Sequence, residues 1–196
     1  MKIANTSLFK NSFTSRLVAK TSHESGCKRK EYKIYQLNKD DDASYFDDMV
    51  LDWRCPMLVQ DARWEFFERQ KADEFYVLEN SNKEILAFAK ISNHKKDCVE
   101  LDLIETKPWL AFRHSNRKSK YIGETMLSFL LKRTQMEKNK FFKAPHCISI
   151  AQGFYEKCGF EHDAIEERKM FKTRDTFDEL IEQNEKHTGS KIELLF

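Results

Sequence analysis

A basic stretch that runs into a predicted helix is the first place in the sequence where chemistry is expected. The stretch is Arg113–Gly123, and apolar residues at helical spacing begin at Ile122. The first amides of a helix have no partner inside the helix and carry partial positive charge, so phosphate groups bind there. Three residues add charge and a hydroxyl donor: Lys118, Ser119 and Lys120. This arrangement suits a pyrophosphate, although a solvated basic loop without a ligand has the same composition.

A second segment, Ala151–Phe160, reads A-Q-G-F-Y-E-K-C-G-F. It resembles the A-x-x-F-Y-x-K-x-G-F signature of the GNAT superfamily of N-acetyltransferases, and every specified position matches. Upstream, residues 104–108 resemble the end of the family's fourth strand, and residues 118–127 fall where the family has its Q/R-x-x-G-x-G/A pyrophosphate loop. The resemblance covers about residues 32–173. It implies a GNAT-like α/β fold of the α+β type, with a mixed, mostly antiparallel central sheet flanked by helices.

The resemblance also implies an activity. Members of the family use acetyl-CoA as a co-substrate, without a metal, and an acceptor amine attacks the thioester directly. Tyr155 is implied as the general acid for the leaving thiolate, because a phenol ordinarily has a pKa of about 10 and stays protonated at neutral pH. The residues that the resemblance implies for acetyl-CoA binding are Ile104, Thr106, Lys118, Ser119, Lys120, Tyr121, Ile122, Gly123, Glu124 and Phe154.

The general base is expected among the carboxylates of the predicted strand at residues 99–105. Alternation puts Glu100 and Asp102 on one face of this strand. The other face then holds three apolar residues, Val99, Leu101 and Leu103. Glu105 is our first choice because it lies at the end of the strand, beside the expected position of the acetyl group. Glu100 and Asp102 stay open as bases that act through water, and a solvated strand face would also explain these carboxylates.

Three positions depart from the family pattern. Lys118 stands where Gln or Arg is usual, and Ile148 replaces an Asn often found before the signature helix. Tyr121 occupies the place of the first loop glycine, which in the family lets backbone amides approach the phosphates without a Cβ in the way. We expect the lysines of the loop to supply charge where the backbone geometry is poorer.

The remaining polar residues do not form a recognisable site. The histidines at 94, 114, 146 and 162 lack metal-ligand spacing, and the five cysteines include no C-x-x-C pair, so we expect no metal centre. Cys147 and Cys158 are expected to pack as small buried residues rather than to act as nucleophiles. Trp109, in the predicted loop, is a candidate for an acceptor pocket.

Periodicity predicts the elements that must position these residues. Strands are expected at residues 31–37, 75–78, 85–91, 99–105, 141–142 and 168–173. Helices are expected after the acidic run at residues 40–42, around residues 64–69, and at 122–137, 149–157 and 177–186. The three central strands read as an antiparallel meander, and the whole order indicates a mixed α/β architecture rather than repeated βαβ units.

Length and composition indicate one globular domain. The chain has 196 residues, 40% of them hydrophobic, and no apolar run long enough to cross a bilayer. The expected divisions are a flexible basic tail at 1–31, an acetyltransferase domain at 32–174, and a C-terminal helix and strand extension at 175–196. The expected location is cytoplasmic, away from membranes, although the tail leaves a targeting or secretion signal open.

Charge keeps a second class of function open. The net charge is +2, but residues 1–31 carry seven Lys or Arg against two Glu, and residues 107–143 carry ten against two. One interpretation is an N-acetyltransferase acting on a small amine, a protein lysine or an aminoacyl-tRNA. The alternative is a catalytically degenerate GNAT-fold binding protein for an acidic partner or nucleic acid. The sequence leaves the oligomeric state open, a homodimer included.

Overall fold

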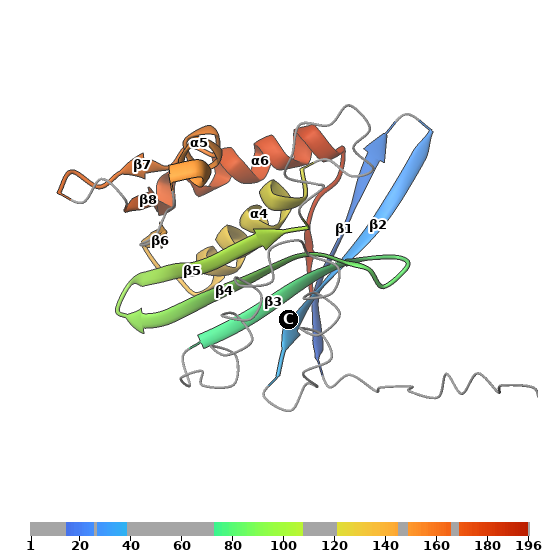
Figure 1. Cartoon of the computed structure of the whole chain (residues 1–196), viewed down its shortest axis with the longest axis horizontal. Helices are drawn as coiled ribbons and strands as arrows, with labels where there is room; N and C mark the ends of the chain where they lie inside the picture. The colour runs from blue at the N-terminus through green and yellow to red at the C-terminus, as the bar shows by residue number, and fades with distance from the viewer. Residues whose placement is uncertain are drawn as a thin grey trace, which may run out of the picture.

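The computed structural model describes residues 15–25, 27–38, 73–107, 121–144, 149–165 and 169–195. Their strands form one nine-stranded sheet in the order β7-β8-β6-β5-β4-β3-β2-β1-β9 (Figure 1). β5 and β6 are parallel, and the other neighbouring strands of this sheet are antiparallel. The bounds are β1 Arg16–Ser25, β2 Lys28–Leu37, β3 Asp73–Asn80, β4 Ile85–Lys95, β5 Cys98–Thr106, β6 Phe141–Ala144, β7 Glu161–His162, β8 Met170–Thr173 and β9 Glu193–Leu194. The expected mixed, mostly antiparallel sheet is confirmed.

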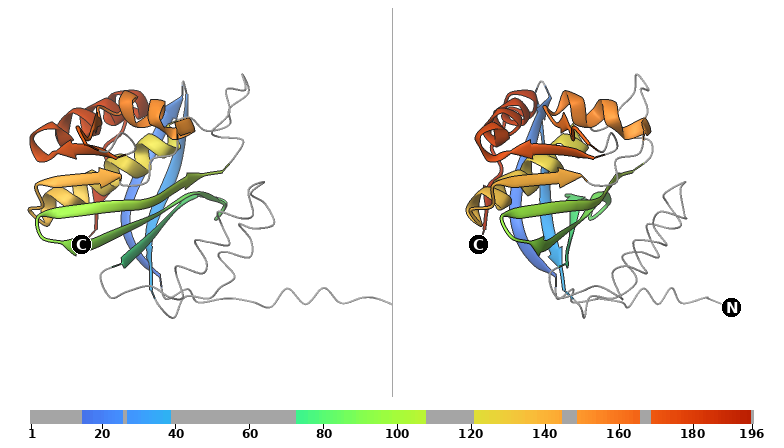
Figure 2. Two further views of the ribbon diagram at one scale, coloured as in Figure 1. Left: turned by 60° about the vertical axis from the view of Figure 1, so that its left-hand side comes forward. Right: turned by 90° about the vertical axis from the view of Figure 1, so that its left-hand side faces the viewer.

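The helices of the described residues lie where periodicity places them. They are α4 Ile122–Met136, α5 Ser149–Lys157 and α6 Phe177–Thr188, with a 3₁₀ turn at Arg174–Thr176 before α6. Gly159, at φ +74°, follows α5 in the left-handed conformation that commonly ends a helix. Figure 2 shows α4 and α6 on the same side of the sheet, and α6 contacts both α4 and β1. The C-terminal helix is therefore packed against β1, the first strand of the described residues.

The meander predicted from three strands is confirmed as β3, β4 and β5. α4 packs on the face of this meander that carries Tyr76, Ala87 and Ala89, and the Tyr76 and Phe129 rings meet edge to face at 5.1 Å. The two helices predicted between residues 40 and 69, Trp109 and the basic residues 113–120 lie outside the described residues.

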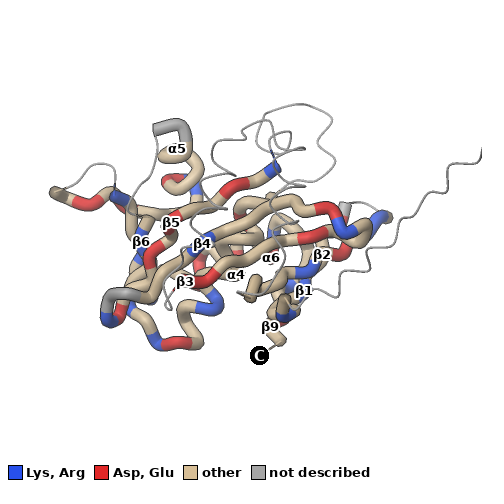
Figure 3. Tube along the Cα trace, turned by 60° about the horizontal axis from the view of Figure 1, so that its bottom comes forward, with Lys and Arg blue, Asp and Glu red and all other residues tan. Residues whose placement is uncertain are grey.

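The flexible tail expected over residues 1–31 is wrong for residues 16–25, which form β1, and for residues 28–31, which belong to β2. β1 pairs with β2 on one side and with β9 on the other. Val18 and Ala19 are completely buried, β1 contacts α6, and His23 Nε2 of β1 lies 3.0 Å from Thr125 Oγ1 of α4. A thinly apolar segment is ordered here because its neighbours come from β2 and from the far end of the chain. Figure 3 shows the resulting run of Lys and Arg along the β1–β2 hairpin.

β5 contains one extra residue relative to β4. Lys90 pairs with Leu103, but the next residue, Ile91, pairs with Leu101, so no residue of β4 pairs with Asp102. This is a β-bulge, which inverts the alternation of side chains along the rest of the strand.

Because of the bulge, the residues at the end of β5 lie on the opposite faces from those that strict alternation predicts. Val99 and Leu101 lie in the core as expected, but after the bulge Ile104, rather than Leu103, packs against that core. Ile104 and Thr106 therefore face α4, since they pair with Ala89 and Ala87. Glu105, which strict alternation from Leu101 would direct toward α4, lies on the opposite face of the sheet.

Candidate active site

The two parallel strands β5 and β6 run together for only part of their length. Three residues of β5, Cys98 to Glu100, pair with Phe141 to Lys143 of β6. β5 then continues through Leu101–Thr106 with no partner from β6. α4 follows β5 along the chain and α5 follows β6, so side chains of these two helices can meet at the separated end of β5.

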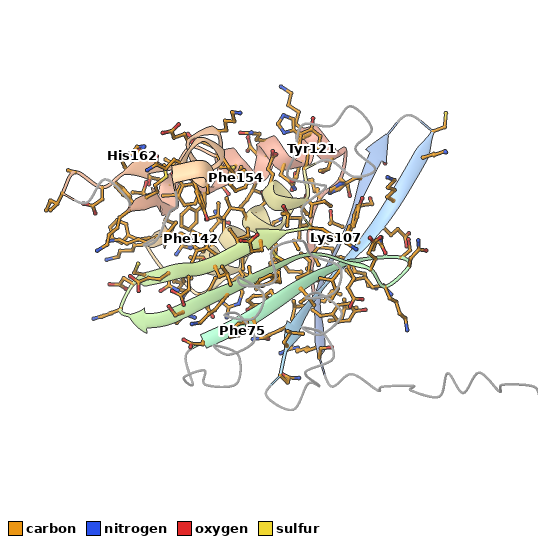
Figure 4. All side chains as sticks on the ribbon, in the orientation of Figure 1. Phe75, Lys107, Tyr121, Phe142, Phe154 and His162 are labelled. Atoms are coloured by element: carbon orange, nitrogen blue, oxygen red, sulfur yellow. The ribbon has the colours of Figure 1, made fainter. Side chains whose placement is uncertain are left out.

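Three residues from different elements converge at this end. A Cβ built on Gly123 would lie 3.4 Å from Phe154 Cζ and 3.4 Å from Thr106 Cγ2. Gly123 belongs to the first turn of α4, Phe154 to α5 and Thr106 to the last position of β5; Phe154 is labelled in Figure 4. All three were predicted to bind acetyl-CoA. A Cβ at these distances would be in ordinary van der Waals contact, but a side chain larger than alanine at position 123 would have to displace Phe154 or Thr106.

The amino end of α4 is not capped by a side chain within the described residues. Its N-cap residue is Tyr121, whose carbonyl accepts the Thr125 amide at 2.8 Å. Ile122 is buried against the core. Because the first amides of a helix have no partner inside the helix, this end can bind an anion. Lys118, Ser119 and Lys120, also predicted for this site, lie outside the described residues.

Tyr121 adopts the left-handed conformation that the family's glycine would favour. Its φ is +62° and its ψ is +17°. Its ring stacks on His187 of α6, with ring centroids 4.7 Å apart and planes inclined by 18°. His187 Nδ1 in turn lies 2.9 Å from Glu124 Oε1. The aromatic ring at 121 is therefore placed on the C-terminal helix, whereas the atoms nearest to Gly123 come from Phe154 and Thr106.

Glu124 is a buried carboxylate one residue beyond Gly123. Burial raises the pKa of Glu124, and its hydrogen bond with His187 offsets part of that rise. The side chain is directed at α6, as the His187 contact shows. Among the predicted cofactor residues, Glu124 therefore contacts α6 within the described part of the chain.

Two of the three candidate bases, Asp102 and Glu105, differ in the described residues that surround them. Asp102 accepts a hydrogen bond from Ser92 at 3.3 Å and forms an ion pair with Lys90 at 3.4 Å. Glu105 has no hydrogen bond or ion pair to any residue that the structure describes. Burial raises the pKa of the Glu105 carboxyl. Burial also raises the pKa of the Asp102 carboxyl, so among the described residues the two carboxylates differ in their partners rather than in the direction of their pKa shifts.

Tyr155 is a buried residue in an aromatic group. It is 6% exposed, and its ring makes edge contacts with Phe154 at 5.4 Å and Phe160 at 5.3 Å. Its carbonyl accepts the amides of Cys158 and Phe160, which closes the end of α5. These contacts fix the phenol beside Phe154, which itself contacts the Gly123 position. Burial raises the pKa of the Cys158 thiol to about 12, so this thiol stays protonated near neutral pH.

Sequence reasoning missed two residues near this site. Lys107 directly follows Thr106; its side chain is 3% exposed and its Nζ donates to Glu84 Oε1 at 2.7 Å (Figure 4 labels it). Its position at the end of a strand was visible, but the partner that permits its burial was not. His187 gave no local signal, because it reaches Tyr121 only through the packing of α6 on α4.

The described residues contain no group of His, Cys, Asp or Glu that could hold a metal ion. His162 instead pairs with Glu156, with Nε2 and Oε1 3.0 Å apart. No helix in the described ranges has the length and apolar character needed to cross a membrane.

Comparison with known proteins identifies the fold. The sequence matches no family model and no curated protein. The structure, however, is similar to a GNAT-family acetyltransferase from Staphylococcus aureus, with a TM-score of 0.53 and 12% identity, covering 73% of this chain and 99% of that one. A tyrosine-to-phenylalanine mutant of the AtaT toxin, bound to the C-terminus of its antitoxin AtaR and to acetyl-CoA, is similar with a TM-score of 0.57 and 14% identity, covering 78% of this chain and 99% of that one. A mutant of spermidine N-acetyltransferase SpeG from Vibrio cholerae is similar with a TM-score of 0.51 and 11% identity, covering 74% of this chain and 95% of that one.

Proposed function

We propose that this chain, which has the fold of the GNAT acetyltransferases, is an acetyl-CoA-dependent N-acetyltransferase that acts on an amine. The observation that carries this proposal is the convergence of Thr106, Gly123 and Phe154 beside an uncapped helix end. The same end of the sheet carries the carboxylate Glu105, which forms no hydrogen bond or ion pair with the described residues. Fold alone does not give function, so the proposal depends on these residues.

The residues present fit acetyl-CoA. The first amides of α4 and the lysines at 118 and 120 would hold the pyrophosphate, since both supply positive charge. Gly123 leaves room for backbone to approach a ligand, because no Cβ fills the space toward Phe154 and Thr106. Ile104 and Thr106 lie on the α4 face of β5, in the part that pairs with β4 but not with β6, and would line the pantetheine arm. When bound, acetyl-CoA supplies the activated acetyl group.

Two residues would move the protons of the transfer. Glu105 would take a proton from the acceptor ammonium, so that the amine nitrogen can attack the thioester carbonyl carbon. The new C–N bond would form as the C–S bond breaks, and the Tyr155 phenol would donate its proton to the departing sulfur. The nitrogen of the new amide would release its second proton to the Tyr155 phenolate, which restores the phenol. Because Glu105 and Thr106 lie on opposite faces of β5, the acceptor would approach from the face away from α4.

Calorimetry with acetyl-CoA, followed by thiol release with a panel of amines, peptides and aminoacyl-tRNA, tests the proposal. Gly123→Leu should abolish acetyl-CoA binding because its side chain would occupy the space between Phe154 and Thr106. Gly153→Leu is the matched control: a Cβ at Gly153 has no atom within 4 Å, so binding should be retained. Absence of acetyl-CoA binding to the unmodified chain contradicts the proposal.

A second candidate function is the binding of an anionic macromolecule without turnover. The observation that favours it is the exposed run Lys28–Lys30 on β2. Nucleic-acid binding that weakens steeply with salt, together with no acetyl-CoA binding, would support this candidate instead.

A further inference from the structure

Among the described residues, the ring of Tyr121 is in contact with the C-terminal helix. A left-handed φ is rare for a residue with a Cβ, and no side-chain cap stabilises this end of α4 among the described residues. The residue is also 40% exposed, so the core covers its ring only in part. Among the described residues, the ring contact of Tyr121 is the stack on His187.

His187 is itself fixed by two helices. Its Nδ1 bonds the Glu124 carboxylate of α4, and its backbone lies in the last turn of α6. α6 is joined to α4 one turn earlier, where Thr125 Oγ1 donates to Asn184 Oδ1 at 2.9 Å, and both side chains are completely buried. The imidazole ring therefore has a defined position relative to the amino end of α4.

We propose that His187 is a positioning residue for acetyl-CoA binding: it keeps the Tyr121 ring on α6, and so keeps the first amides of α4 open to the pyrophosphate. This inference rests on the proposed function. A tyrosine replaces the small residue that would leave these amides uncovered, and an unheld ring at the same backbone position could rotate over them. The C-terminal helix is thereby part of the cofactor site, although it supplies no atom to the ligand.

A purely structural role for His187 makes a different prediction. If His187 only stabilised α6, its removal would be harmful whatever residue stood at 121. If it acts through the Tyr121 ring, its removal should be harmless once that ring is absent. The two roles are therefore separated by a pair of substitutions at 121 and 187.

The experiment measures acetyl-CoA affinity by calorimetry, and KM and kcat by thiol release, for the full chain. His187→Ala should weaken acetyl-CoA binding by about 2- to 10-fold, the range expected for losing one aromatic stack, and should raise KM with kcat little changed. His187→Phe should restore affinity because it keeps a ring at this position. Tyr121→Gly should bind at least as well as the unmodified chain, and the double variant Tyr121→Gly/His187→Ala should match Tyr121→Gly.

His162→Ala is the matched control, since it removes the other His–Glu pair of the described chain and should leave affinity unchanged. Normal affinity in His187→Ala, or a loss that persists in the double variant, overturns the positioning role and leaves the proposed function intact. No acetyl-CoA binding by the unmodified chain overturns the proposed function and this role together.

Discussion

Glu105 lies directly across from Phe88 on the neighbouring strand, on the face of the sheet opposite α4. The residue before it and the residue after it both face α4, because the bulge at Asp102 has inverted the alternation of β5. One strand end therefore presents a carboxylate to one side and, to the other, the two residues proposed to line the cofactor. In the proposed function, this arrangement would let two substrates reach the same strand from different faces.

The first prediction concerns pH. Glu105 must be ionised to accept a proton, and burial raises its pKa above the ordinary value of 4.5. The kcat/KM for transfer should therefore rise as the pH is raised through this pKa, because the carboxyl is protonated and inactive as a base at lower pH. Glu105→Gln should remove this limb of the profile and lower kcat/KM by about 100-fold. A retained limb in Glu105→Gln, with its loss in Glu100→Gln, would move the base to Glu100.

The second prediction concerns the Tyr155 phenol. Tyr155→Phe keeps the ring contacts with Phe154 and Phe160 but removes the proton donor. Turnover should fall by about 100-fold, while acetyl-CoA affinity should change by less than about twofold. Stopped-flow thiol release and calorimetry measure the two quantities separately. Unchanged turnover would remove Tyr155 from the mechanism.

The third prediction concerns a buried ion pair that holds α4 on the sheet. Arg133 Nη2 donates to Glu74 Oε1 at 2.6 Å and to Glu137 Oε1 at 2.7 Å, and Tyr76 also donates to Glu74. Glu74→Ala should lower the free energy of unfolding by about 3 kcal/mol, because it removes the most buried counter-charge of Arg133. Urea unfolding measures this change.

Glu137→Ala is the control for this pair. Glu137 is more exposed and lies one helical turn from Arg133, so its removal should cost about 0.5 kcal/mol. Equal decreases in the free energy of unfolding for Glu74→Ala and Glu137→Ala would show that the greater burial of the Glu74–Arg133 pair does not increase its contribution to stability.

The fourth prediction compares two glycines six residues apart. Gly159 has φ +74°, and a Cβ there would lie 2.8 Å from Lys172 Nζ, which donates to the Gly159 carbonyl. Gly159→Ala should therefore lower the free energy of unfolding by about 1 kcal/mol or more. Gly153 lies inside α5 with open space around it, so Gly153→Ala should raise stability by about 0.5–1 kcal/mol. Thermal unfolding of both variants checks the opposite signs.

The sequence by itself determined the elements whose signals are local. The apolar face of α4, the glycine that ends α5 and the meander β3–β5 follow from side-chain period and turn residues within a few positions of each other. The signature around Phe154 and Tyr155 likewise indicated the fold that the comparisons show. Each of these features depends on residues that are neighbours along the chain.

Tertiary structure decided what depends on distant partners. β1 is ordered because β2 and β9 pair with it, and composition alone had suggested a tail. The face that Glu105 occupies depends on a bulge that is visible only in the register between β4 and β5. The Tyr121 ring is placed by His187, 66 positions further along the chain. Strand register and helix packing are set by the free energy of the whole core, so no local pattern contains them.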